Sequence, residues 1–352
     1  MLVTARRAMR SVKIHLIELV RGPKNLRHLK GIEAGRIAMD LSQVGTDEGL
    51  SLVKAFTGKV KADALLSDDD WVLAWLAGSR SHFEPRCTIL APDRDALLSL
   101  WDKSYQIRLA EQCGFDVLPT YALNAEEDIF AIPGDAFPAV LRPSYLNSAQ
   151  PPFKARVLAT PEEMRSLYAS TRWTRPPIVQ RFCLGPNLVL HGVRAQSGDW
   201  LRLQLFNVYR KYQGFSVSMQ PIPLPASIES AARQFVETAG LTGPFHFELL
   251  ASDTEKKAYF LEINCRLGGT TGKIIELGFD EPGLTFSAFN VVTAKPLPPL
   301  RARHRRVTSL RLNLFQAWND LLNRRDPLAY PKLPRLQSMI AALKEALVVH
   351  HD

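Results

Sequence analysis

The segment from Ala258 to Gly269, "AYFLEINCRLGG", constrains the fold more than any other part of the sequence. It alternates apolar and polar side chains and then ends in two glycines. A strand sends alternate side chains to opposite faces, so Glu262, Asn264 and Arg266 share one face and the apolar residues between them share the other. The pattern predicts a strand with one face in a core and the other open to water or a ligand.

A second strand-like segment, "FHFELLA", lies just upstream, and the turn-forming "SDTEKK" separates the two. A hairpin centred near Glu255 has one wholly apolar face. The pairs expected on that face are Phe247 with Ile263, Leu249 with Leu261, and Phe245 with Cys265. The pairs expected on the opposite face are Glu248 with Glu262, and His246 with Asn264.

Like charges directly opposite each other on a sheet are unfavourable, so the predicted pair of Glu248 and Glu262 indicates a cation between them. Two carboxylates and the amide oxygen of Asn264 suit Mg²⁺, which keeps phosphate oxygens and water in its remaining positions. Arg266, on the same face, adds a cation suited to a transferred phosphoryl group. The alternative is that both carboxylates face solvent, because a symmetric hairpin can slip by one residue.

The predicted class is α/β, in three parts. Short strand-like and helix-like segments alternate over residues 1–98, which predicts a doubly wound N-terminal domain. Residues 99–297 are predicted to be an α+β core, in which the helical "DKSYQIRLAEQCG" ends at Gly114 and long hairpins follow. Residues 298–352 follow a proline-rich stretch and are predicted to be a basic, mostly helical C-terminal segment.

The formal net charge of +9 is concentrated near the C-terminus. From Arg301 to Arg335, nine Lys or Arg against two acids give +7, so the rest of the chain is nearly balanced. The cluster "RARHRR" lacks interleaved aromatic residues for base stacking, and we therefore do not expect nucleic acid as a partner. Such a cluster is more typical of a solvated surface or the rim of an anionic-substrate site.

The apolar runs and the cysteines of the sequence indicate in which cellular compartment the protein is expected. No apolar run approaches the roughly 20 residues that span a bilayer, so no membrane partner is expected. The four cysteines are widely spaced, which favours a reducing cytoplasm over a disulfide framework or a zinc motif. The basic start, with no acid before Glu18, has two interpretations: an organellar transit peptide, or a lead into a first strand, "VKIHLIELV".

Several segments, in this order, resemble the ATP-grasp superfamily of carboxylate-amine (or carboxylate-thiol) ligases, which includes D-alanine:D-alanine ligase, biotin carboxylase and the carbamoyl phosphate synthetase halves. The resemblance covers about Asp63 to Leu297. It implies a two-lobed core, with a small lobe at about 115–182 and a large lobe at about 183–297. The segments that carry it are "WDKSYQIRLAEQCGFDVLPTY", "FPAVLRPSY", "PPIVQRFCLG", "LTGPFHFELL", "YFLEINCRLGGTTG" and "ELGFDEP".

The resemblance also implies roles for the nucleotide-binding residues. Lys103 and Arg142 match the cations over the phosphates, with arginine standing at position 142 where the family usually has lysine. Gln180, with the backbone of Arg181 and Cys183, matches the segment that holds the adenine edge. The ribose position carries an amide in place of the family's frequent glutamate, at Asn187.

For the remaining residues the resemblance implies catalysis and metal binding. Glu248, Glu262 and Asn264 match the metal ligands, and Arg266 matches the catalytic arginine that steadies the phosphoryl group and the acyl intermediate. The cofactors implied are ATP and Mg²⁺, with Mn²⁺ as an alternative metal. The two glycines after Arg266 let the backbone pass close to bound substrate.

The function implied is ligation of a small carboxylate to an amine through an acyl phosphate, with release of ADP and phosphate. A homodimer is compatible with this resemblance. One departure stands out: the segment "YLNSAQPPFKARVL" has no glycine where the family usually has a glycine-rich flap, and Lys154 or Arg156 would substitute with side-chain charge. A nucleotide-binding pseudoenzyme of the same fold is therefore one alternative. A scaffold whose basic tail binds nucleic acid or an acidic partner is the other.

Overall fold

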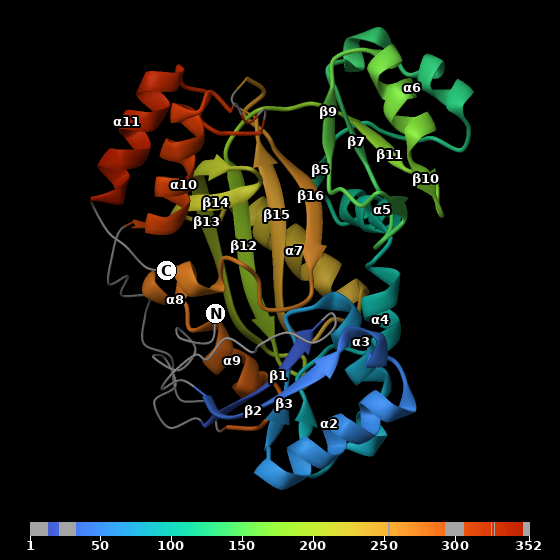
Figure 1. Cartoon of the computed structure of the whole chain (residues 1–352), viewed down its shortest axis with the longest axis vertical. Helices are drawn as coiled ribbons and strands as arrows, with labels where there is room; N and C mark the ends of the chain where they lie inside the picture. Colours follow the sequence, from blue (N-terminus) through green and yellow to red (C-terminus); the bar gives the residue numbers. More distant parts are fainter. Residues whose placement is uncertain are drawn as a thin grey trace.

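The computed structural model describes residues 13–20, 33–252, 254–292, 306–324, 326 and 328–347. The transit-peptide interpretation concerns residues at the start of the chain that lie mostly outside these ranges. The expected first strand is confirmed as β1. Within these ranges, the N-terminal part holds two parallel strand pairs, β1 with β2 and β3 with β4, together with helices α2, α3 and α4 (Figure 1). Their bounds are β1 (Ile14–Val20), β2 (Glu33–Asp40), α2 (Asp47–Val60), β3 (Ala64–Leu65), α3 (Asp70–Gly78), β4 (Thr88–Ile89) and α4 (Arg94–Ser99).

A seven-stranded sheet forms the large lobe, in the order β17-β14-β13-β12-β15-β16-β5. Its neighbours are antiparallel except that β5 runs parallel to β16. The strands are long hairpins because their sequences alternate apolar and polar residues between turn-forming segments. Their bounds are β5 (Asp116–Val117), β12 (Asn187–Arg194), β13 (Trp200–Tyr212), β14 (Phe215–Ile222), β15 (Gly243–Ala251), β16 (Ala258–Asn264) and β17 (Val307–Thr308).

Helices cover this sheet and seal its core. On one side, Phe235 of α7 stacks on Phe260 of β16, and Phe115 packs beside Phe247 of β15. On the other side, Leu284 of α9 joins a second buried cluster. The helices concerned are α5 (Lys103–Gln112), α7 (Ala226–Thr238), α8 (Thr271–Glu276) and α9 (Glu281–Ala288).

The small lobe is a four-stranded sheet in the order β6-β11-β7-β9, backed by α6. It stands beside the upper end of the large sheet in Figure 1, and a further strand pair, β8 with β10, adjoins it. The bounds are β6 (Thr120–Ala122), β7 (Ala139–Arg142), β8 (Ala149–Gln150), β9 (Arg156–Leu158), α6 (Pro161–Ser170), β10 (Arg172–Trp173) and β11 (Ile178–Arg181).

The β15–β16 hairpin has the predicted register from the His246–Asn264 pair to the Glu248–Glu262 pair. Between Glu248 and the turn, the register differs from the prediction. The pairs Glu248–Glu262, His246–Asn264 and Phe247–Ile263 are confirmed. The expected Leu249–Leu261 pair is wrong, because a bulge after Glu248 places Leu249 opposite Phe260. The ladder ends at Asn264, so it does not include the expected Phe245–Cys265 pair. The extra residue lets Phe260 fill the core while Leu261 reaches the cavity described below.

Where the structure describes it, the C-terminal segment is mostly helical, as predicted, with one short strand, β17, that joins the large sheet. Helices α10 (Leu310–Leu321) and α11 (Arg335–Ala346) form an antiparallel hairpin beside β13 and β14, at the left edge of Figure 1. The α/β class is confirmed, whereas the domain boundaries at 98 and 297 stay predictions.

Gly192, in the middle of β12, offers a test of the sheet packing. A Cβ there would overlap the ring of Phe245 and lie 2.6 Å from Leu203 Cδ2. We expect Gly192→Ala to lower the free energy of unfolding by roughly 1–3 kcal/mol, because both neighbours are packed in the core. Gly58→Ala in α2 is the matched control: nothing lies within 4 Å of the added carbon, and alanine favours helix. Chemical denaturation of both variants is the measurement, and equal shifts would contradict the packing described.

Candidate active site

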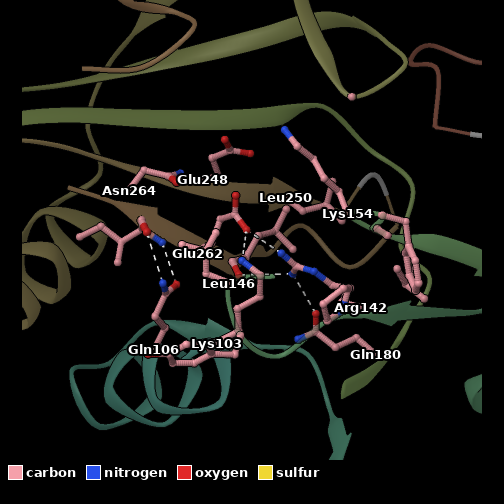
Figure 2. Close-up of a pocket in the computed structure, with 18 of the residues that line it drawn as sticks. Lys103, Gln106, Arg142, Leu146, Lys154, Gln180, Glu248, Leu250, Glu262 and Asn264 are labelled. Carbon is pink, nitrogen blue, oxygen red and sulfur yellow. Dashed lines mark hydrogen bonds and ion pairs between the residues drawn. The ribbon is translucent and has the colours of Figure 1, made fainter. Parts of the chain in front are cut away.

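A cavity of about 620 Å³ lies between the small lobe and the large sheet. All ten residues singled out from the sequence line it, so the fold brings together side chains that are up to 163 positions apart, from Lys103 to Arg266. Figure 2 shows the part of this cavity where the charged groups meet. The ten are Lys103, Arg142, Gln180, Arg181, Cys183, Asn187, Glu248, Glu262, Asn264 and Arg266.

Glu262 is held by two cations from different elements (Figure 2). Lys103 Nζ donates to Glu262 Oε2 at 2.8 Å, and Arg142 Nη2 donates to the same oxygen at 2.7 Å. Lys103 is the first residue of α5, whose N-terminus is capped by Asp102, and Arg142 ends β7. Burial alone would raise the pKa of Glu262, but the two cations outweigh it and hold the pKa well below its usual range.

Glu248 lies directly across the ladder and differs from its neighbour. In the described part of the chain its carboxylate has no hydrogen bond or ion pair, and burial together with the charge of Glu262 raises its pKa to about 7. A half-buried carboxylate without a partner is costly, so this position favours a bound cation.

The donor set at this point fits Mg²⁺. It consists of oxygens only, from the carboxylates of Glu248 and Glu262 and the amide of Asn264, and hard cations prefer oxygen. Across the residues that the structure describes, no group of three or more His, Cys, Asp or Glu side chains is close enough to hold a metal. A metal here would therefore have two carboxylates, one amide and ligands that the protein does not supply.

We predict that Glu248→Gln changes stability in a pH-dependent way. The raised pKa means that the metal-free wild type loses stability as the pH rises from 4.5 through about 7, whereas glutamine does not titrate. Above pH 7 the variant should be more stable by roughly 1–2 kcal/mol, less than the full pKa shift implies because the carboxylate is partly exposed. Below pH 4.5 the two proteins should be nearly equal.

Excess Mg²⁺ and ATP should reverse this order above pH 7, because the variant has lost a charged ligand. Melting curves at pH 4 and pH 8, with and without Mg²⁺-ATP, are the measurement. A variant whose shift is the same in all four conditions would contradict a metal site between the two strands.

In β11, Gln180 is buried and fixed from both ends. Its amide donates to Thr120 Oγ1 at 3.0 Å, and its carbonyl accepts from Arg142 at 3.3 Å. The Arg181 side chain turns away to pair with Glu255 at 2.6 Å. The resemblance implied a role for the backbone of Arg181 alone at the adenine edge, and that role stays a prediction.

Lys211, at the end of β13, joins the site at Asn187. The structure puts Lys211 in the cavity, where its Nζ donates to Asn187 Oδ1 at 2.8 Å and burial lowers its pKa. Its backbone exchanges two hydrogen bonds with Tyr330, and Leu328 of the same segment also lines the cavity.

Arg266 is held by a residue that the sequence analysis did not assign to the site. Asp70, the first residue of α3, accepts from Arg266 Nε at 2.8 Å and from its Nη2 at 3.0 Å. Burial would lower the pKa of Arg266, but these two bonds outweigh it and raise the pKa. The run of three acids at the start of α3, from Asp68 to Asp70, was the available signal. Asp69 caps the helix, as such a run predicts, while Asp70 lines the cavity.

The glycine-free flap lines the cavity and is anchored to the rest of the small lobe. Its β8 strand pairs with β10, and Asn147 adopts the left-handed conformation, with φ of 57°, that glycine would otherwise supply. Lys154 lines the cavity and therefore adds side-chain charge, as the sequence suggested.

Two histidines lie behind the site. His191 bonds Glu281 at 2.7 Å and Thr270 at 2.9 Å, and its ring stacks on His246. The ring of His246 fills the space beside Gly268, where a Cβ would lie 2.6 Å from it. Both are buried, and they support the turn after Arg266.

Two lobes flank one cavity, with Arg142 from the small lobe, Lys103 from α5 and two opposed carboxylates from the large sheet. At the level of the fold, this agrees with the resemblance found in the sequence. The chain is similar to the ADP complex of N5-carboxyaminoimidazole ribonucleotide synthetase (TM-score 0.65, 11% identity, covering 97% of this chain and 91% of that one). It is also similar to the biotin carboxylase domain of Hydrogenobacter thermophilus 2-oxoglutarate carboxylase (0.62, 13%, 86% and 68%).

A third similar structure is N5-carboxyaminoimidazole synthetase from Staphylococcus aureus (TM-score 0.60, 14% identity, covering 84% of this chain and 76% of that one). Neither a protein-family model nor a curated protein matches the sequence. At these identities the likeness is one of fold. In the described part of the chain, no helix is both long enough and apolar enough to cross a membrane.

Proposed function

We propose that this protein is an ATP-dependent ligase that activates a small carboxylic acid as an acyl phosphate and joins it to an amine, releasing ADP and phosphate. The observation that carries the proposal is the charge arrangement in one cavity between the small lobe and the large sheet. Lys103 and Arg142 converge on Glu262, while Glu248 opposite is left without a partner. Such an arrangement is suited to a metal-bound polyphosphate, which supplies both anionic oxygens and a cation.

In this proposal each group has one task. Lys103, Arg142 and Lys154 bind phosphate oxygens, Gln180 and the backbone of Arg181 and Cys183 hold adenine, and Asn187 with Lys211 binds the ribose or the phosphates next to it. Glu248, Glu262 and Asn264 hold Mg²⁺ or Mn²⁺, which when bound screens the charge of the triphosphate. The similar structures support these cofactors, since one was determined with MgADP and bicarbonate and another with ADP.

Arg266 is the proposed catalytic residue. Its guanidinium would steady the negative charge that develops on the phosphoryl group as the substrate carboxylate attacks the terminal phosphorus and ADP leaves. The amine then attacks the acyl carbon, phosphate leaves, and the amine proton passes to solvent or phosphate. The flap and the two lobes exclude water, which would otherwise hydrolyse the acyl phosphate. Asp70 orients the guanidinium through its two-point contact.

A nucleotide-binding pseudoenzyme is the second candidate. The observations that favour it are the glycine-free flap, whose strand is paired to β10, and the bidentate hold of Asp70 on Arg266. In that case ATP would bind and stabilise the fold, and no acid would stimulate ADP release.

We also propose the cytoplasm as the compartment, since none of the four cysteines forms a disulfide.

The reaction class is testable before the natural amine is known, because hydroxylamine intercepts an acyl phosphate whatever nucleophile normally follows. In a screen of amino acids and small acids with ATP and Mg²⁺, we expect at least one acid to give hydroxamate and ADP in equal amounts. Arg266→Ala and Lys103→Ala should each reduce the rate more than about a hundredfold, a cost on the order of 3 kcal/mol.

The exposed Lys59→Ala, on α2, is the control and should keep full activity. Melting curves establish that the variants are folded. AMP and pyrophosphate as products would indicate an adenylating mechanism and overturn the proposal. A phosphorylated product stable to hydroxylamine would indicate a kinase, and ATP binding without turnover for any acid would favour the pseudoenzyme.

A further inference from the structure

The C-terminal helix pair, α10 and α11, exposes its large apolar side chains, and α10 turns its polar side chains toward the protein. In α10 the buried side chains are mostly polar, namely Asn313, Gln316, Ala317, Asn319 and Asp320. The large apolar side chains instead face outward. Of the fourteen exposed large apolar residues in the described part of the chain, ten lie between residues 314 and 347, so the exposed apolar surface is concentrated on this one hairpin. We name these ten the apolar face: Leu314, Phe315, Trp318, Leu321, Leu322, Leu333, Leu336, Ile340, Leu343 and Leu347.

Hydrogen bonds fix this orientation. Arg210 of β13, which is 5% exposed, donates to Asn313 at 2.9 Å, to Gln316 at 2.7 Å and to Glu345 at 2.8 Å. Ser338 of α11 bonds both Gln316 and Asp320 of α10. Rotating either helix to bury its apolar side would leave these buried polar groups unsatisfied, which is costly. The apolar face is therefore a stable feature of the fold.

The charges around the apolar face are of one sign. Among the described residues from 306 to 347, every exposed charged side chain is cationic; of the three acids, Asp320 is buried, and Asp326 and Glu345 are partly buried. Arg311 and Lys344 lie near the ends of their helices, and Arg324 and Arg335 flank the connection between them. An apolar centre with arginines at its edge and no exposed acid has the composition of a protein interface.

We propose that the apolar face is the interface between two copies of this chain, related by a two-fold axis. Ten side chains of this size at roughly half exposure offer on the order of 800–1,000 Å² per copy, and a stable dimer needs about 800 Å² per partner. So large an apolar area on a lone chain would be unusual, whereas homodimer interfaces are the most apolar class.

The cationic rim gives the dimer a distinctive salt dependence. In a two-fold arrangement the same rim lies on both copies, so its like charges repel across the interface. Each exposed and screened pair contributes little, so burial of the apolar face dominates and the dimer forms. Salt screens the repulsion and also strengthens apolar association. An acidic partner or an anionic lipid surface would show the opposite dependence.

The test is sedimentation equilibrium of the full chain at 50 mM and 500 mM salt. We expect a species of twice the 39.4 kDa chain mass, with a dissociation constant that falls about threefold or more as salt rises. Trp318→Lys and Leu336→Lys should each raise the dissociation constant at least about a hundredfold. Phe130→Lys, on the small lobe, is the matched control and should leave it unchanged, since all three side chains are 58–63% exposed.

Each other outcome overturns the proposal. In one such outcome, the protein stays monomeric at both salt concentrations, even at 100-fold the protein concentration expected to saturate the dimer. Either another part of this chain then covers the apolar face, or nothing covers it. A dimer indifferent to Trp318→Lys and Leu336→Lys would use another surface. A monomer that co-sediments with phosphatidylglycerol vesicles at low salt, and that Trp318→Lys releases, would make the occupant a lipid surface. Because all the variants change exposed residues outside the cavity, the result does not depend on the proposed ligase activity.

Discussion

The site depends on two carboxylates placed opposite each other on neighbouring strands. Left alone, Glu248 and Glu262 would repel across the ladder, and the protein treats them differently. Glu262 is neutralised by Lys103 and Arg142, which come from a helix and from the other lobe, and Glu248 keeps a pKa near 7. The interaction thus ties both lobes to one oxygen atom. The cavity and the position of the small lobe over the sheet are consistent with that single convergence point.

The part of the structure that could be predicted from sequence is the part that local patterns determine. Alternation along two strands was enough to place Glu248 opposite Glu262, because a shift of one residue would have turned the apolar set to the wrong face. Helix α5 could likewise be predicted from its helical pattern and the glycine that ends it, Gly114. The predicted Leu249–Leu261 pair failed because a bulge adds one residue to β16, and nothing in an apolar run shows which residue is left unpaired.

Contacts between distant segments could not be predicted in this way. Asp70 and Arg266 are 196 positions apart, and the acid run at Asp70 already had a sufficient local explanation as a helix cap. The inward polar side of α10 is similar: its apolar residues recur at helical spacing, but periodicity does not say which side faces the protein. The side that faces inward is decided by Arg210, a buried cation on another element that needs polar partners. The roles of the ten cavity residues also stay predictions, since geometry alone does not assign chemistry.

The contact of Asp70 with Arg266 bears on what counts as a module in this protein. A gene fragment that encodes only residues 99–297 would keep every residue that the resemblance assigns to the nucleotide and the metal, yet it would lose the acid that orients the guanidinium. In such a fragment Arg266 would keep its charge without its two-point anchor and would sample more rotamers. The unit that recombination or engineering can transplant intact is therefore larger than the two lobes, and its minimum start is upstream of α3.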